Sequence, residues 1–160
     1  MGPLLIGAVT LALACLAPQA QARILEQTDS DKVAAIKPSF VRLATDLVQT
    51  SKRPDLSAAD AECINATLRE MTQIADELGS YEHLITIEDR IDDIGNDASM
   101  RGILRFAVDK ALVILDIEQK RMRQLLEQCG HLPLSGGKGR EALQFIDTTA
   151  TVLKSIRPRL

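Results

Sequence analysis

The sequence predicts an all-α protein: an antiparallel bundle of four helices, or five if Gly79 breaks one of them, following a cleaved signal peptide. Apolar residues recur at steps of three and four along four long segments, which is the spacing of one helix face. Aromatic residues make up only 2% of the chain, so Ala, Leu and Ile supply most of the apolar content, which suits packed helices better than strands. No segment longer than four residues alternates convincingly as a strand.

The first 22 residues predict export. An apolar run over residues 4–17 is too short to span a bilayer as a helix. It leads to Ala20-Gln21-Ala22, the small-x-small pattern after which signal peptidase cuts. Residues 23–160 are then expected to form one helical-bundle domain, periplasmic or secreted. This domain has no second long uncharged apolar run, so we expect no stable membrane insertion after cleavage.

Two other interpretations of this N-terminal segment compete with cleavage. Cys15 suggests lipid attachment, but Ala12 stands where a lipoprotein signal usually has Leu, and the apolar run continues past the cysteine. N-myristoylation fits less well, because Ile6 occupies the position where that motif requires Ser or Thr. The segment also lacks the Lys or Arg usual at the start of a signal peptide. Cleavage after Ala22 is the interpretation we retain.

The first predicted helix covers residues 31–49. Pro38 interrupts it, yet the apolar stripe keeps its phase across the proline. This pattern indicates either a kinked helix or a short turn before a helix that begins at Pro38, where a first-turn proline costs no hydrogen bond. The stripe consists of Val33, Ile36, Phe40, Leu43 and Leu47.

The second predicted helix covers residues 57–94, with Ser57 and Asp60 as candidate caps for its free backbone N–H groups. Gly79-Ser80 would either bend this helix or break it in two, and Gly95 would end it. Its inner face is predicted to be Ile64, Leu68, Met71, Ala75 and Leu78.

The third predicted helix, capped by Asp97 or Ser99, runs to about Cys129. Its centre is apolar around most of its circumference, so we expect it to be the most buried helix. Its predicted core positions are Leu104, Val108, Ala111, Leu112 and Leu115. A polar glycine-rich loop, SGGKGR at residues 135–140, is expected to precede a last helix over residues 140–156.

Two cysteines remain in the predicted mature domain, Cys63 and Cys129. If the second and third helices form one hairpin that turns at Asn96, each cysteine lies 33 residues from the turn, and equal rise per residue brings them level. Thiols placed in this way in an oxidising compartment are expected to bond. The alternative is two unrelated buried cysteines. A redox-active pair is disfavoured, because the Cys-x-x-Cys spacing is absent.

Glu88, Asp89, Asp92 and Asp93 form an acidic cluster near the end of the second predicted helix. These carboxylates lie on neighbouring helix faces and lack the alternating spacing of a calcium loop, so a solvated surface is favoured over a metal site. Asp92 and Asp93 oppose the helix dipole, which is the reason to keep a partner-facing role for the cluster as a hypothesis.

No catalytic, metal or cofactor motif is present. His83 and His131 are the only histidines, and neither lies in a zinc, haem-attachment or nucleophile motif. Lys138 and Arg140 are candidates to attract an anion, although the phosphate-loop spacing is missing. A net charge of −3 without a concentrated basic face argues against nucleic acid as a partner.

These observations predict an exported, periplasmic, non-catalytic protein that acts by binding another protein, whose identity the sequence does not reveal. The prediction depends on the signal segment, the expected disulfide and the lack of a catalytic constellation. The alternative is a carrier of a small molecule, haem or metal ion, with its site inside the bundle.

Overall fold

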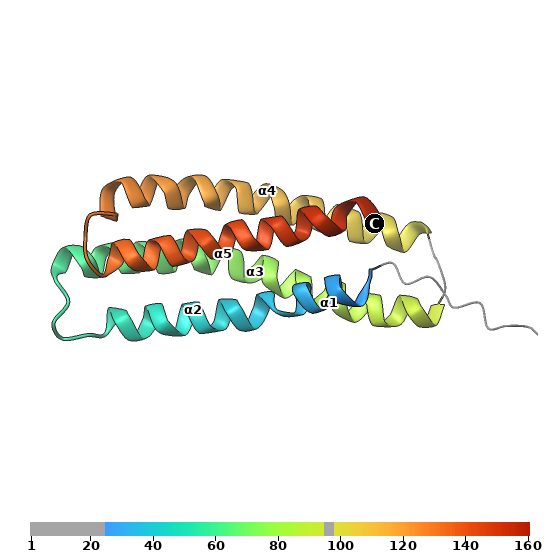
Figure 1. Cartoon of the computed structure of the whole chain (residues 1–160), viewed down its shortest axis with the longest axis horizontal. Coiled ribbons are helices and arrows are strands. Elements are labelled where there is room, and N and C mark those ends of the chain that lie inside the picture. The colour runs from blue at the N-terminus through green and yellow to red at the C-terminus, as the bar shows by residue number, and fades with distance from the viewer. Residues whose placement is uncertain (1–24, 95–97) are drawn as a thin grey trace, which may run out of the picture.

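The computed structural model describes residues 25–94 and 98–160, without the side chains of residues 81 and 84–94. Every regular element in this part of the chain is helical, and the long helices lie side by side in an elongated bundle (Figure 1). The all-α prediction is therefore confirmed. The elements are α1 (Gln27–Ala34), α2 (Ile36–Ser51), α3 (Ala58–Ile94), α4 (Ala98–Cys129), α5 (Ser135–Ile156) and the 3₁₀ helix η1 (Arg157–Arg159).

The connections α2–α3 and α4–α5 lie at one end of the bundle, whereas α1 and the C-terminus lie at the other (Figure 1). Helices α3 and α5 each contact α1, α2 and α4 and also contact each other, so the two share the centre of the packing. Apolar side chains from every α-helix meet in one core. The largest of those that are fully buried are Leu47, Ile64, Met71, Ile74, Leu115, Met122, Ile146 and Leu153.

The first segment forms two helices, so it is neither a single kinked helix nor a helix that begins at Pro38. Helix α1 ends at Ala34, and α2 begins two residues later at Ile36, before Pro38 rather than at it. The N–H of Ala35 donates to Asp31 O at 3.0 Å, so the backbone hydrogen bonding continues into the junction. The proline is the third residue of α2, where its missing N–H would lack a partner within the helix in any case.

Helix α3 runs through Gly79-Ser80 without a break, so the five-helix alternative that depended on a break there is wrong. Gly79 is exposed, with no neighbouring atom within 4 Å of the position where a Cβ would lie. A solvated glycine makes helix formation less favourable by only about 1 kcal/mol relative to Ala, and burial of the preceding Ile74 and Leu78 offsets this cost. The predicted turn at residues 95–97 lies outside the described residues.

A disulfide joins Cys63 and Cys129, as predicted, with their Cα atoms 6.0 Å apart. Cys63 lies near the beginning of α3 and Cys129 is the last residue of α4. The bond therefore fixes these two helix ends beside each other, and an unbroken α3 is what allows the two cysteines to meet.

The glycine-rich segment at residues 135–140 is helical, so the prediction of a loop there is wrong. Asp60, which belongs to α3, caps this helix from outside: its Oδ1 accepts hydrogen bonds from the N–H of Ser135 at 3.0 Å and from its hydroxyl at 2.8 Å. Ser57 caps α3 as predicted, because its Oγ accepts from the N–H of Asp60 at 3.0 Å. The Ser135 N–H and hydroxyl and the Ser57 hydroxyl lower the pKa of Asp60.

The glycines of this segment also permit close packing. A Cβ on Gly136 would lie 2.6 Å from Gly130 O, and one on Gly139 would lie 2.8 Å from the side chain of Leu126. Glycine has poor helix propensity, so this first part of α5 depends on the Asp60 cap and on contact with the end of α4. Neither contact is visible as a local pattern in the sequence.

Helix α4 departs from the prediction in its burial and in its first residue. Leu104, Val108, Ala111 and Leu115 are buried as expected, but Leu112 is only partly buried, and the outer face of the helix is exposed. The helix begins at Ala98, so Ser99 lies inside it rather than capping it. Asp97, the other candidate cap, lies outside the described residues.

Removing the disulfide should lower stability without abolishing the helices. The bond closes a loop with a sequence separation of 66 residues, for which chain entropy predicts a loss of about 4 kcal/mol on removal. The helices themselves depend on their apolar faces. In Cys63→Ser/Cys129→Ser, circular dichroism at low temperature should retain the helical signal, while the thermal midpoint falls well below that of the oxidised wild type. Equal midpoints for the two proteins would contradict this account.

Candidate functional site

Four apolar side chains on α4 face solvent instead of the core. We call Ile103, Phe106, Val113 and Ile117 the α4 stripe; their exposed fractions are 56%, 71%, 61% and 41%. Their spacing of three, seven and four residues places them along one line of the helix. The stripe lies opposite the buried face of the same helix, so α4 is apolar on both sides, which explains why its sequence suggested complete burial.

An open groove of about 500 Å³ runs beside the stripe between α4 and α5. Val113 and Ile117 border it from α4, and Ala150 and Lys154 border it from α5. The exposed apolar surface is therefore not an isolated ridge but continues into a shallow depression. Such a contiguous apolar surface is typical of a contact site for another macromolecule.

Three charged groups around the stripe, Lys110, Asp116 and Asp109, are paired within the molecule. Lys110, at the middle of the stripe, has its Nζ 3.4 Å from Glu77 Oε1 on α3. Asp116 accepts from Lys120 at 2.7 Å. The guanidinium of Arg157 binds both carboxylate oxygens of Asp109. These three pairs neutralise much of the charge around the stripe, while Lys154 adds a positive charge at the edge of the groove.

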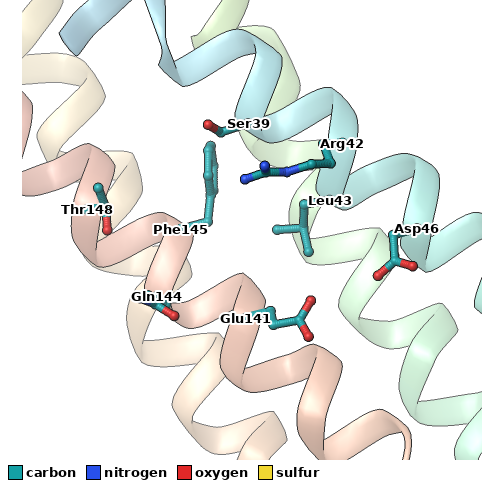
Figure 2. A pocket seen from close by; sticks show the side chains of 8 residues that line it. All are labelled: Ser39, Arg42, Leu43, Asp46, Glu141, Gln144, Phe145 and Thr148. Atoms are coloured by element: carbon teal, nitrogen blue, oxygen red, sulfur yellow. The ribbon is translucent and has the colours of Figure 1, made fainter.

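A second groove, of about 680 Å³, lies between α2 and α5 (Figure 2). Leu43 and Phe145 supply its apolar surface, and Figure 2 shows the Arg42 side chain extending toward Phe145. Phe145 is held in turn by a tilted contact with Phe40, with ring centroids 5.9 Å apart. The other lining residues are polar: Ser39, Asp46, Glu141, Gln144 and Thr148.

The two cations expected to attract an anion lie near this groove but are engaged elsewhere. Lys138 forms ion pairs with Asp46 and with Glu141, the latter at 3.0 Å. Arg140 donates to the backbone oxygen of Gly130 at 3.3 Å. Both side chains therefore tie the beginning of α5 to its surroundings, and they do not form an open anion site.

A buried carboxylate pair joins α3 and α4. Glu118 is only 2% exposed, and its Oε1 accepts from Arg121 at 2.8 Å. The same Arg121 nitrogen lies 3.9 Å from Glu70 Oε2 and also donates to Gln73. Among the described residues, the Oε2 atoms of Glu70 and Glu118 have no hydrogen-bond donor. One guanidinium thus serves two carboxylates, and a proton shared between them would supply the missing donor.

Burial raises the pKa of Glu118 to about 7, and the neighbouring Glu70 adds to the rise while Arg121 opposes it. The pair is a proton-binding element near neutral pH. It lacks the third ligand and the open position that metal catalysis requires.

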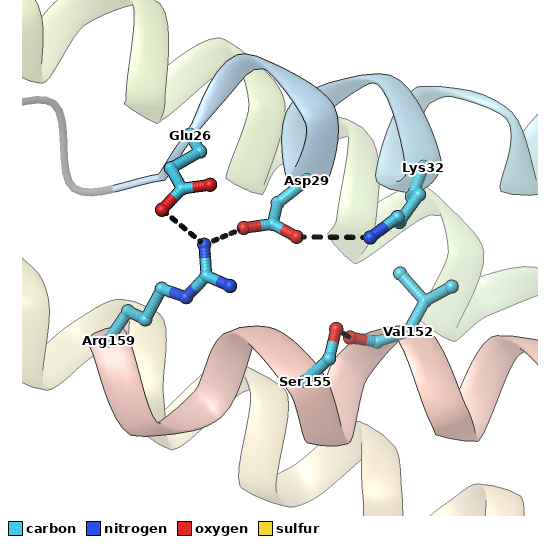
Figure 3. A network of polar contacts seen from close by, with 6 residues as sticks. All are labelled: Glu26, Asp29, Lys32, Val152, Ser155 and Arg159. Atoms are coloured by element: carbon cyan, nitrogen blue, oxygen red, sulfur yellow. Dashed lines mark hydrogen bonds and ion pairs between the residues drawn. The ribbon is translucent and has the colours of Figure 1, made fainter.

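The opposite end of the bundle is held by a buried aspartate (Figure 3). Asp29 on α1 is 1% exposed and pairs with Arg159 of η1 and, at 3.5 Å, with Lys32. Arg159 also lies 3.5 Å from Glu26, so the C-terminal turn is fastened to α1. These contacts pair charges of α1 with the C-terminal turn.

The acidic cluster Glu88, Asp89, Asp92 and Asp93 lies on α3, but its side chains are outside the described residues, so its predicted partner-facing role stays a prediction. His83 and His131 are both exposed. In the described part of the chain, no three or more His, Cys, Asp or Glu side chains gather where they could hold a metal ion.

Sequence reasoning missed the α4 stripe and the Glu70–Glu118 pair. The sequence shows that α4 is apolar around most of its circumference, but it does not show that one apolar face is buried and another is exposed. Glu118 stands within a long amphipathic helix and looks like any surface glutamate. Only the packing of α3 against α4 brings it to Glu70.

Comparison of the chain with models of known families, with curated proteins and with solved structures finds no match in any of the three. Within residues 25–94 and 98–160, none of the helices combines the length and apolar character that crossing a membrane requires.

The Glu118 carboxyl should make stability fall as pH rises toward neutrality. Its pKa is higher in the folded protein than in the unfolded chain, so its stabilising effect is complete below pH 4.5 and is lost as pH rises through about 7. Over this pH range, the raised pKa of Glu118 changes the free energy of unfolding by about 3 kcal/mol. We expect the free energy of unfolding, measured with urea between pH 5 and 8, to change less with pH in Glu118→Gln than in the wild type. The exposed Glu127→Gln on the same helix is the matched control and should retain the wild-type slope. Identical slopes for all three proteins would contradict this assignment.

Proposed function

We propose that the protein is exported, with residues 1–22 removed as a signal peptide, and that residues 23–160 form an antiparallel helical bundle in the periplasm or outside the cell. We propose further that it acts by binding another protein molecule and not by catalysis. The observation that carries the binding role is the α4 stripe.

The stripe supports protein binding because exposed apolar side chains are not distributed evenly over the described surface. Four of the six large exposed apolar residues lie on α4, including Phe106, which is 71% exposed. The other two, Val41 and Val48, lie on α2. Aromatic side chains such as Phe106 are enriched in protein contacts, and the core of a contact is more apolar than its rim. A helix clamped by a disulfide at one end presents them with little loss of conformational entropy.

Export is supported by the disulfide together with the N-terminal apolar segment. Disulfides persist in oxidising compartments and are rare in the reducing cytosol. The non-catalytic role is supported by the placement of the buried charges. Asp29, Asp60 and Glu77 each contact a neighbouring helix or turn, and Glu118 pairs with Arg121, which also approaches Glu70 on α3. These groups stabilise the bundle, and our proposal assigns them no reaction.

A second candidate function is small-molecule binding in the α2–α5 groove. Its Leu43 and Phe145 offer an apolar surface, and Arg42 extends over it (Figure 2). A ligand with a compact apolar body and an acidic group would suit this arrangement. The groove lies at the bundle surface, so this candidate is a carrier of such a molecule and not of a haem or metal ion enclosed by the helices.

Site-specific photocrosslinking in the native host tests the binding role. A photoreactive phenylalanine derivative at position 113, in place of Val113, should form a covalent adduct with a protein, because this side chain lies within the α4 stripe. The matched control replaces Val41, an exposed valine on α2 that is outside the stripe. Adducts should appear on gels at position 113 and be absent at position 41.

Absence of any protein adduct at position 113, or the same adducts at both positions, would contradict protein binding through the stripe. The same purified material tests export. N-terminal sequencing should begin at or near Arg23, and a mature chain that retains Met1 or carries lipid on Cys15 would contradict the signal-peptide assignment.

A further inference from the structure

The α4 stripe is nearly symmetrical about Lys110. Ile103 and Ile117 lie seven residues to either side of it, Phe106 lies four residues before it and Val113 lies three residues after it. If two copies place their stripes face to face with the α4 helices running in opposite directions, the Ile103 end of one copy meets the Ile117 end of the other. The Phe106 of each copy then faces the region of Val113. A surface with this property is complementary to itself, as a two-fold interface requires.

We propose that the α4 stripe binds a second copy of this chain, with the two α4 helices paired in opposite directions about a two-fold axis near Lys110. This inference rests on the proposed function, since it names the protein that the stripe contacts.

Charge supports a second copy as the occupant. Lys110 would lie near its own symmetry mate, but its ammonium is 3.4 Å from Glu77 in the same molecule, which offsets the repulsion. Its aliphatic stem can then cover apolar surface. Asp116 is paired with Lys120, and Asp109 is paired with Arg157 and lies in the field of Arg105. The four side chains of the stripe carry no charge and Lys154 adds a positive charge only at the edge of the groove, so a strongly charged partner or an anionic membrane would find little complementary charge on the stripe itself.

The area of the surface is also consistent with a dimer. The exposed fractions of the four side chains leave on the order of 450 Å² of apolar surface on each copy, a size that marks a contact site. Two copies would thus bury roughly 900 Å², and the Lys110 stem and the partly buried Ile114 beside the stripe bring the total to about the 1,000 Å² that a specific interface needs. We therefore expect a reversible dimer.

Sedimentation equilibrium on the purified exported protein, from roughly 1 µM to 1 mM, tests this inference across the range of a weak dimer. The wild type should pass from monomer to dimer as its concentration rises. Phe106→Glu and Val113→Glu, tested singly, should remain monomeric throughout, because each places a charge in the centre of the contact. Val41→Glu on α2 is the matched control and should dimerise as the wild type does. Circular dichroism should show the same helicity in all four proteins.

A wild-type protein that stays monomeric over the whole range would overturn the inference, as would a Phe106→Glu variant that dimerises like the wild type. So would a monomeric wild type that sediments with vesicles of phosphatidylglycerol and phosphatidylcholine, because the stripe would then be a lipid contact. A monomer that still forms an adduct with a different protein through position 113 overturns the dimer alone and leaves the proposed function standing.

Discussion

The structure depends on a double clamp at the end where α3 begins, α4 ends and α5 begins. The Cys63–Cys129 disulfide joins the first two of these helix ends, and Asp60 joins the first to the third through two hydrogen bonds from Ser135. The covalent bond restricts the unfolded chain, whereas the Asp60 carboxylate organises the folded one, because it satisfies a donor that the glycine-rich start of α5 cannot satisfy by itself. The clamp fixes the position at which helix α5 begins, and α5 then contacts α2, α3 and α4.

Charges placed between helices extend the same principle along the bundle. Asp29 fastens α1 to the C-terminal turn, Lys110 reaches Glu77 across the α3–α4 contact, and Arg121 lies between Glu70 and Glu118. In the last of these clusters one cation, Arg121, faces two carboxylates. Protonation of one carboxylate removes the excess negative charge, so the stabilising effect of the cluster rises when it binds a proton. Asp60 behaves in the opposite way: its lowered pKa means that its stabilising effect is complete above the unfolded pKa and is lost as acid protonates it. The bundle thus contains two titrating contacts with opposite pH dependence.

The sequence predicted what local patterns determine. Apolar periodicity gave the helical segments, and the equal distances of Cys63 and Cys129 from residue 96 gave the disulfide. It did not predict what depends on contacts between distant segments. The segment around Gly136 and Gly139 has loop composition and is helical because Asp60, far away in sequence, and Leu126, near the end of the preceding helix, accommodate it. Likewise, periodicity shows that α4 is apolar around its circumference, but only the packing shows that Leu115 is buried while Phe106 is exposed.

Hydrogen exchange measured by mass spectrometry, with the disulfide intact and after reduction, tests the clamp most directly. In the oxidised protein, the amides over the first two turns of α5 should be protected, despite the glycines at positions 136, 137 and 139. Reduction should release protection in those turns together with the beginning of α3 and the end of α4, because the three share one anchor. The central turns of α4 around Val108 and Leu115 should remain protected. The account would be contradicted if the first turns of α5 exchanged at the unprotected rate in the oxidised protein, or if reduction left their protection unchanged.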